Sequence, residues 1–558
     1  MLKGKKARFL TVALAVVLAG SVLAGCSNKS SAGGKKVEQV IRYNLGADPK
    51  TIDPGLNSSV EGGTVIANAF EGLLDTDSKD QPVAGVAEKW EISTDGLKYT
   101  FHLRKDAKWS DGKAVTAGDF EYAWKRALDP NTASEYAYQL YYLKNGEAFN
   151  MSADPKATKK ATADQVGVKA VDDVTLEVTL ENPTPYFLSL MSFPTYMPLR
   201  KDVVDKDPKG WATKPETYVS NGAFKMKEWK PKDSITFVKN DNYWDKGKVK
   251  LDTLVYKLID QETSYMSAFK SGQLDFIEAP PSQEIPNLVK EGTATISPYL
   301  GTYYYSFNVS DNAEKVNKDV AKVLKDVKVR KALTLAIDRK EIVESVTKGG
   351  QRPATSFVPR GIAEAAGKDF KQKDYYKETA DVEQAKKLLA DAGYPDGKGF
   401  PTIEILYNNG QGHQDIAQAV QDMLKKNLGI SVTLRSVERK VQLTATNSHE
   451  YQVARNGWIA DYADPMTFLD MWVTGGGNNV AGYSNPEYDK LITAAKSETD
   501  AAKRMTELHQ AEDLLMNDMP IMPIYEYTNV VCIKDYVKNA RKSSLGFVFF
   551  KDAYIEKK

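Results

Sequence analysis

The segment Tyr451-Gln-Val-Ala-Arg-Asn-Gly-Trp-Ile-Ala-Asp-Tyr-Ala-Asp-Pro465 has the pattern of a strand that carries both charge signs. Arg455 and Asp461 are six residues apart, an even number, so in a strand both side chains leave the same face. Their Cα atoms would lie about 20 Å apart at ~3.3 Å per residue. If the two side chains lean inward, their charges come within about 10–13 Å, the span of three or four extended residues.

A cation and an anion that face one groove suit a zwitterion such as a short peptide, whose ends carry opposite charges. Gly457 lies between the two charged residues and would let another backbone approach closely. The residues alone equally fit a plain strand with one solvated ion pair, which would contribute little to stability. From this segment by itself, both interpretations stay open.

The rest of the chain alternates strand and helix patterns without a simple repeat. Tyr99 to Leu103 and Val174 to Leu180 alternate apolar with polar residues, which predicts half-buried strands. A capping box at Thr116-Ala-Gly-Asp119 predicts the start of a helix that Asp129-Pro130 ends. Further elements are predicted as helices near 327–346 and 415–428 and strands near 403–407 and 432–434. This alternation indicates a mixed α/β architecture, and 558 residues are too many for one core.

Motifs for catalysis or metal binding are poorly represented. The four histidines occur singly, and His449-Glu450 lacks the second histidine of a zinc motif. We therefore expect no catalytic residue, metal or cofactor. The 29 tyrosines are the more suggestive feature, since tyrosine suits adaptable recognition surfaces, although alternating tyrosines are also typical of strands that lie half in a core.

Residues 1–25 have the pattern of a secretory signal peptide: Lys3, Lys5, Lys6 and Arg8, then an apolar run, then small residues. A retained membrane anchor is the alternative, although the apolar run is short for a bilayer span. Leu23-Ala-Gly-Cys26 resembles the lipobox of bacterial lipoproteins, in which the cysteine is acylated. Residues 26–36 would then form a lipidated flexible tether.

Removal of the signal peptide would take away four of the 75 basic residues and leave 71 against 74 acidic ones, a net charge near −3. A nearly neutral surface gives no reason to expect nucleic acid as a partner. With Cys26 acylated, only Cys532 would remain, so no internal disulfide is expected. Cys532 lies in an apolar run and is expected to be a buried core thiol.

Many short motifs resemble those of the oligopeptide-binding lipoproteins that serve peptide ABC importers, the extracytoplasmic solute-binding proteins of family 5. The resemblance covers residues 37–558. The motifs that carry it are Phe70-Glu-Gly-Leu-Leu74, Ala87-Glu-Lys-Trp90, Asp95 to Arg104, Trp109-Ser-Asp-Gly112, Val115 to Phe120, Ser220-Asn-Gly-Ala-Phe224, Val329-Arg-Lys-Ala-Leu333, Ile337-Asp-Arg339 and Gly457-Trp-Ile-Ala-Asp-Tyr462.

The resemblance implies a two-lobed α/β fold like that of periplasmic binding proteins, with mixed sheets and an extra domain inserted in the first lobe. The segments 37–80, 218–305 and 525–558 would form lobe I. The inserted domain would comprise 81–217 and lobe II 306–524.

The resemblance also implies a set of binding residues. Asp461 would hold the α-ammonium of a peptide, and Arg455 would lie toward the carboxylate end of short ligands. The backbone of Gly457, Trp458 and Ile459 and that of Ser58, Ser59 and Val60 would sandwich the extended peptide, and three aromatic pocket positions match less securely. Those aromatic positions are Tyr136, Tyr299 and Tyr304.

Two positions depart from the best-known member of the family. Thr446 stands where that member has a second basic residue, and Arg439 stands where it has a tryptophan. Capture of the ligand carboxylate and the shape of the pocket are therefore expected to differ in this chain.

The function implied is that of a non-catalytic receptor, a monomer anchored by lipid at Cys26 to the outer face of the bacterial cell membrane. It would capture oligopeptides and deliver them to an ABC import permease. The nearest alternative is a receptor for another solute of the same superfamily, such as a nickel chelate, a sugar or haem. A surface hydrolase and an adhesin or chaperone-like protein are more distant alternatives.

Overall fold

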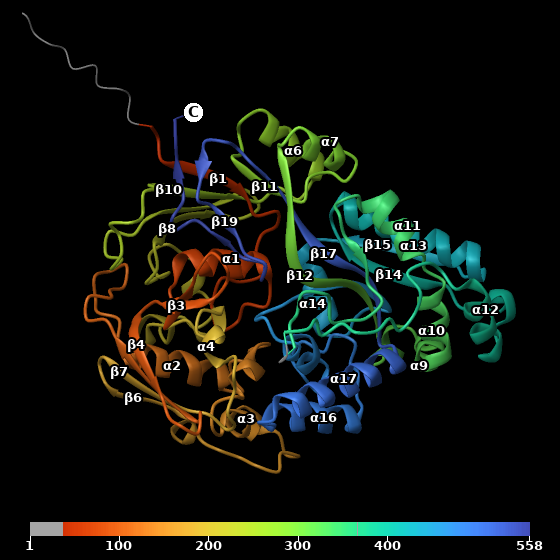
Figure 1. Cartoon of the computed structure of the whole chain (residues 1–558), viewed down its shortest axis with the longest axis horizontal. Helices are drawn as coiled ribbons and strands as arrows, with labels where there is room; N and C mark the ends of the chain where they lie inside the picture. The colour runs from red at the N-terminus through yellow and green to blue at the C-terminus, as the bar shows by residue number, and fades with distance from the viewer. Residues whose placement is uncertain (1–36, 365–366, 558) are drawn as a thin grey trace, which may run out of the picture. The chain divides into compact units, whose positions relative to one another are not determined.

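The computed structural model describes residues 37–364 and 367–557. Residues 38–558 form one compact unit. The signal peptide 1–25 and the tether 26–36, with the lipidation position Cys26, lie outside the described residues. The described part has the mixed α/β composition that the sequence predicts (Figure 1).

A mixed sheet of eleven strands runs through the described part of the chain. Its order is β15-β14-β16-β12-β17-β11-β1-β10-β9-β8, with β13 paired to β17. The strands are β1 (Val40–Asn44), β8 (Phe224–Lys230), β9 (Ser234–Lys239), β10 (Thr253–Lys257), β11 (Phe276–Glu278), β12 (Ala294–Phe307), β13 (Arg352–Pro353), β14 (Ile403–Asn408), β15 (Val432–Val437), β16 (Val453–Ile459) and β17 (Ile521–Ile533).

The two long strands β12 and β17 join the two ends of this sheet. They pair with each other along most of their length. β11 pairs with the C-terminal end of β17, and through β11 the strands β1 and β8–β10 are attached. β16 pairs with the C-terminal half of β12 and carries β14 and β15. In Figure 1, β12 and β17 accordingly cross the middle of the view between the two groups of strands.

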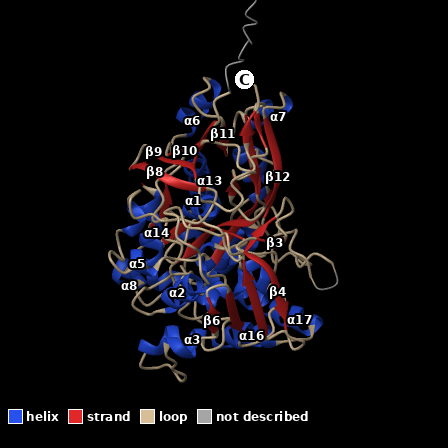
Figure 2. Cartoon of the chain, turned by 90° about the vertical axis from the view of Figure 1, so that its left-hand side faces the viewer, coloured by secondary structure: helices blue, strands red, loops and turns tan. Residues whose placement is uncertain are grey.

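A second, four-stranded sheet is built from residues within the predicted inserted domain. Its order is β4 (Ala87–Ile92), β5 (Lys98–Leu103), β7 (Thr175–Thr179) and β6 (Val168–Asp172). Alternate residues of β5 are buried, as its pattern predicts. The helix α2 (Ala117–Leu128) begins at the predicted capping box of Thr116 and Asp119, which is confirmed. Figure 2 shows this sheet below the strands β8–β10 of the large sheet.

The helix predicted near 327–346 is wrong in one respect, because it is interrupted. α10 (Val327–Leu335) ends at Leu335, and the short helix α11 (Arg339–Glu341) begins after Asp338, whose side chain caps it. At the break the backbone of Asp338 is extended rather than helical. The fully buried guanidinium of Arg339 donates hydrogen bonds to the carbonyl oxygens of Thr334, Ile337 and Pro523. It thereby satisfies carbonyl groups that the end of α10 leaves without a helical partner.

The remaining helices cover the sheets. They are α1 (Val60–Ala69), α3 (Gly146–Asn150), α4 (Phe187–Leu190), α5 (Lys201–Val204), α6 (Glu262–Lys270), α7 (Ile285–Lys290), α8 (Ala313–Val316), α9 (Lys318–Lys325), α12 (Val382–Asp391), α13 (Gln411–Leu428), α14 (Arg439–Asn447), α15 (Met466–Leu469), α16 (Pro486–Ser497) and α17 (Ala501–Asp518). The smaller strands are β2 (Leu74–Thr76), β3 (Pro82–Ala84), β18 (Val537–Lys538), β19 (Arg541–Lys542), β20 (Val548–Phe549) and β21 (Tyr554–Ile555).

Within residues 37–364 and 367–557, no helix has the length and apolar character needed to cross a bilayer. The same residues contain no group of histidine, cysteine and acidic side chains placed to hold a metal ion. Cys532 is a fully buried free thiol, which confirms its prediction as a core residue.

Candidate functional site

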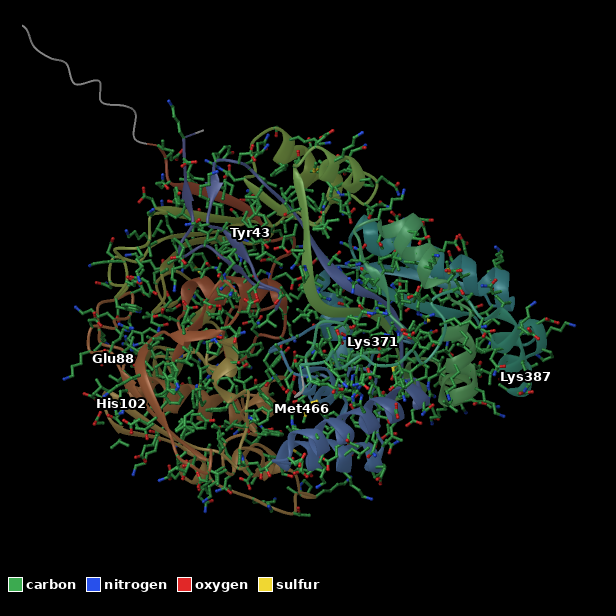
Figure 3. All side chains as sticks on the ribbon, in the orientation of Figure 1. Tyr43, Glu88, His102, Lys371, Lys387 and Met466 are labelled. Atoms are coloured by element: carbon green, nitrogen blue, oxygen red, sulfur yellow. The ribbon has the colours of Figure 1, made fainter. Side chains whose placement is uncertain are left out.

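A cavity of about 850 Å³ lies against β16. Among the predicted binding residues it is lined by Arg455, Gly457, Ile459, Val60 and Tyr299. It therefore brings one end of the segment 451–465 together with the start of α1 and with β12. In Figure 3, Tyr43, which also lines the cavity, is labelled in the interior of the view. Glu88 and Lys387 are labelled at the left and right edges of the molecule.

One edge of β16 is open beside this cavity. β12 pairs with β16 along Val453–Ile459, but on the other edge β14 pairs, among the described residues, only with Val453 and Ala454. The N–H of Ala460 donates to the carbonyl of Leu300 on β12 at 2.8 Å. Because backbone groups alternate between the two edges in an antiparallel pair, those of Gly457 and Ile459 point to the open edge.

Gly457 is required at its position by a close neighbour. A Cβ atom added there would lie 2.4 Å from the hydroxyl of Tyr527. Any side chain at residue 457 would therefore displace Tyr527, which lines the same cavity. The sequence predicts that Gly457 admits another backbone, whereas the close neighbour in the structure is the side chain of Tyr527, which the sequence pattern does not reveal.

Arg455 carries a buried charge that no acidic side chain among the described residues neutralises. It is 7 % exposed. Its guanidinium donates to Asn408 Oδ1 at 3.2 Å and to Tyr527 Oη at 3.0 Å, and it lies 4.7 Å from the ring centre of Tyr303. Its Nε is buried without a hydrogen-bond partner. All of these direct partners are neutral, and the charge of Arg455 acts on the carboxylate of Glu61, whose pKa it helps to lower.

Asp461, at the other end of the segment 451–465, is an acidic side chain without a basic partner in the described part of the chain. It is half-buried, and its carboxylate accepts hydrogen bonds from Gln139 Nε2 at 2.9 Å and Tyr136 Oη at 3.4 Å. Burial and the nearby carboxylate of Asp470 raise the pKa of Asp461 well above its usual value. No cation of the described residues forms an ion pair with it. Met466, labelled near the middle of Figure 3, begins α15 just beyond this residue.

The other predicted binding residues do not gather at one place in the structure. Trp458 is 8 % exposed, and its ring stacks on Tyr136 with centres 6.1 Å apart. Ser59 caps α1 by accepting from the N–H of Gly62, and the hydroxyl of Ser58 is buried without a partner. Tyr304 lies away from the cavity, because it is buried against Phe357 and Trp472.

Four residues at the site have no signal in the sequence pattern. Gln139 belongs to the segment predicted as the inserted domain, and Asn408 ends β14. Glu61 lies in the first turn of α1, and His413 in that of α13. These residues meet the segment 451–465 only through the tertiary fold, so their spacing along the chain carries no information about the site.

β16 therefore has an open edge beside a cavity that Arg455, Gly457 and Ile459 line, whereas Asp461 follows the strand and is not among the residues that line this cavity. Comparison with known proteins identifies the class of protein. The model of the bacterial extracellular solute-binding proteins, family 5, matches residues 81–480. The chain is 42 % identical over 540 residues to the oligopeptide-binding protein OppA of Bacillus subtilis, and the match covers 95 % of each chain. The chain therefore belongs to family 5 of the extracellular solute-binding proteins.

Solved structures confirm the two-lobed α/β fold of this family. The Haemophilus influenzae OppA complex with the peptide RPPGFSPFR matches with a TM-score of 0.86 and 34 % identity, over 94 % of this chain and 100 % of that one. The unliganded open form of the murein tripeptide binding protein MppA matches with a TM-score of 0.61 at the same identity, over 94 % and 98 %. The arrangement of this chain is therefore closer to a peptide complex than to an open form.

Proposed function

We propose that this chain is the receptor of an ABC import system, which captures extended oligopeptides between two lobes and delivers them to a membrane permease. The observation that carries the proposal is the open edge of β16 between two charges that lack counter-charges, Asp461 and Arg455. A peptide supplies backbone groups for the edge, an ammonium for Asp461 and a carboxylate for Arg455. Backbone pairing gives affinity without reading side chains, which suits a receptor of broad specificity.

The guest would run antiparallel to β16, with its amino end at Asp461. Gly457 and Ile459 would then exchange hydrogen bonds with its backbone, and Ser58–Val60 would approach it from the start of α1. Tyr136 and Trp458 would enclose its first residue, since their stacked rings adjoin Asp461. Roomy pockets filled with ordered water would accept varied side chains at modest cost.

The family and the paired long strands support a division into lobes at the predicted boundaries. Lobe I would comprise 37–80, 218–305 and 525–558, the inserted domain 81–217, and lobe II 306–524. In this division β12 and β17 lie at the crossing between lobes, which is where hinge motion would act. Closure would create the surface that the permease recognises.

We further propose that the protein is a non-catalytic monomer on the outer face of the cell membrane. Acylation of Cys26 would anchor it there, and residues 26–36 would give it reach. Cys26→Ala removes the acylation site and is expected to lower the fraction of the protein that partitions with membranes and into a detergent phase.

The test of peptide capture is titration calorimetry with trialanine and N-acetyl-trialanine. We expect acetylation, and separately Asp461→Ala, to weaken binding by ~2–5 kcal/mol, because each leaves one buried charge unpaired. Asp311→Asn, which changes an exposed aspartate, is the matched control and should bind like the wild type. Equal affinity for both peptides would instead favour a receptor for another solute, such as a nickel chelate, a sugar or haem.

A further inference from the structure

A second arginine shares the cavity with Arg455. Arg439, at the start of α14, lines the same cavity and lies near the carboxylate of Glu61, with Nε and Oε1 3.6 Å apart. Glu61 comes from α1, so the contact joins segments that are far apart in the chain. At 3.6 Å the pair is loose, and the second oxygen of Glu61, Oε2, is buried without a hydrogen-bond partner.

Gln442 fixes Arg439 beside β16. The side chain of Gln442 is fully buried, and its Nε2 donates to the carbonyl of Arg455 at 2.8 Å. Its Oε1 accepts from Nη1 of Arg439 at 2.7 Å. One amide therefore ties the guanidinium of Arg439 to the backbone of β16 at Arg455, and both arginines line the same cavity.

The two arginines share the carboxylate of Glu61. Burial opposes ionisation of Glu61, but the charges of Arg439 and Arg455 together with hydrogen bonds from its own backbone and Ser59 outweigh burial. The pKa of Glu61 is therefore lowered and this carboxylate is charged. Burial and the two arginines hold the pKa of His413 well below its usual value, so this imidazole is neutral. Of these four groups, Arg439 and Arg455 are cations and Glu61 is the anion, so the one carboxylate is shared between two guanidinium groups. The cavity is also lined by Asp48, Asp260, Glu262, Glu278, Glu438, Lys232 and Lys440. A buried guanidinium is stabilised by a hydrogen-bonded carboxylate.

We propose that Arg439 is a specificity-determining residue, which binds a carboxylate of the guest together with Arg455. This inference rests on the proposed function, since the amino end of the guest must be held at Asp461. From there the spacing along β16 places the third or fourth residue of an extended guest at the arginines. The carboxylate comes either from the C-terminus of a tripeptide or tetrapeptide, or from an acidic side chain of a longer peptide.

The experiment measures affinities for two matched pairs of peptides by titration calorimetry. The first pair is trialanine as free acid and as C-terminal amide, and the second is Ala-Ala-Glu-Ala-Ala with its Gln counterpart. For the wild type we expect, in at least one pair, the peptide with the carboxylate to bind about tenfold or more tightly than the peptide with the neutral amide. Charge-assisted hydrogen bonds imply a difference of this size. The pair that shows the difference identifies the source of the carboxylate.

Variants assign the effect to Arg439. Arg439→Gln is expected to reduce that ratio about fivefold or more, whereas Lys440→Gln, which removes the neighbouring exposed cation of the same cavity, should leave it unchanged. Glu61→Gln should raise the ratio, because it removes the competing anion. These variants lie on the cavity wall, so their folding is checked by an unchanged thermal transition.

An unchanged ratio in Arg439→Gln, or a wild-type ratio near one for both pairs, would overturn the inference. N-acetyl-trialanine separates this outcome from a failure of the proposed function. If acetylation still weakens binding, the peptide receptor stands and only the role of Arg439 falls. If acetylation has no effect and neither pair binds, both are overturned.

Discussion

At the scale of single residues, the site holds two charges that the protein itself does not neutralise. Asp461 relies on an amide and a phenol, and Arg455 relies on an amide, a phenol and an aromatic face. A buried charge without a counter-charge costs several kcal/mol, which neutral hydrogen bonds offset only in part. A zwitterionic guest would remove both costs at once, so the empty site stores part of the driving force for binding.

Peptide binding is expected to release protons at acidic pH. In the empty site the pKa of Asp461 is raised, chiefly by burial, and a bound ammonium would lower it. Affinity should therefore rise with pH as the empty carboxyl ionises. It should fall again above about pH 8, where the α-amino group of the peptide loses its proton. Calorimetry at pH 5 in two buffers of different ionisation enthalpy measures the released protons, and Asp461→Asn should release none.

Gly457→Ala is expected to weaken peptide binding about tenfold, since the added methyl group would overlap the hydroxyl of Tyr527 at 2.4 Å. Tyr527→Phe removes that hydroxyl. The double variant should therefore bind more tightly than Gly457→Ala alone, with Tyr527→Phe by itself as the reference. If the double variant is no better than Gly457→Ala, the steric explanation is wrong.

At the scale of elements, strands and helices with clear periodicity could be predicted from the sequence. The strand at 403–407 is β14, and the helix at 415–428 is α13, which begins four residues earlier. The break after α10 could not be predicted from apolar periodicity, which continues across it, whereas the hydrogen bond that Arg339 donates there goes to Pro523, a residue distant in the chain. The pairing of β16 with β12 likewise depends on register, which periodicity does not specify.

The helix α17 carries a buried acid that makes stability depend on pH. Oε1 of Glu512 accepts the N–H groups of Phe357 and Val358, and burial raises the pKa of Glu512 to about 7. The folded pKa lies above the unfolded one, so this residue contributes stability that is present below about pH 4.5 and lost as pH rises through 7.

We therefore expect Glu512→Gln to raise the free energy of unfolding by about 1–3 kcal/mol at pH 8 and to change it little at pH 5. The amide oxygen can still accept both N–H groups. Urea unfolding at the two pH values measures the difference. Asp513→Asn is the control, since the pKa of Asp513 is lowered and its removal should not stabilise the protein at pH 8. A Glu512→Gln effect that is equal at both pH values would contradict this prediction.

At the scale of the whole molecule, the sequence motifs identified the family, but contacts between segments that are distant in the chain could not be predicted from them. Glu262 of α6 accepts the N–H of Gly412 at the start of α13 at 2.7 Å, and Lys232 pairs with Glu438 at 2.9 Å. These contacts join segments predicted to lie in different lobes. If the lobes open as proposed, these contacts would be lost, so we expect them to contribute to retention of a guest.

Glu262→Ala is expected to speed peptide dissociation about fivefold, because one hydrogen bond of the closed arrangement is lost. Association should change little, since the open cavity keeps its binding groups. Stopped-flow competition with an unlabelled peptide measures the dissociation rate. Glu291→Ala, at an exposed position, serves as the control. Equal dissociation rates in the two variants would exclude this role for Glu262.

The place of β17 has a consequence for biogenesis. This strand lies at the centre of the large sheet, between β12 and β11, yet it is made of residues 521–533, near the end of the chain. Until it is synthesised, the two groups of strands have no partner through which to join. We therefore expect the large sheet to be completed only after residues 521–533 have been synthesised.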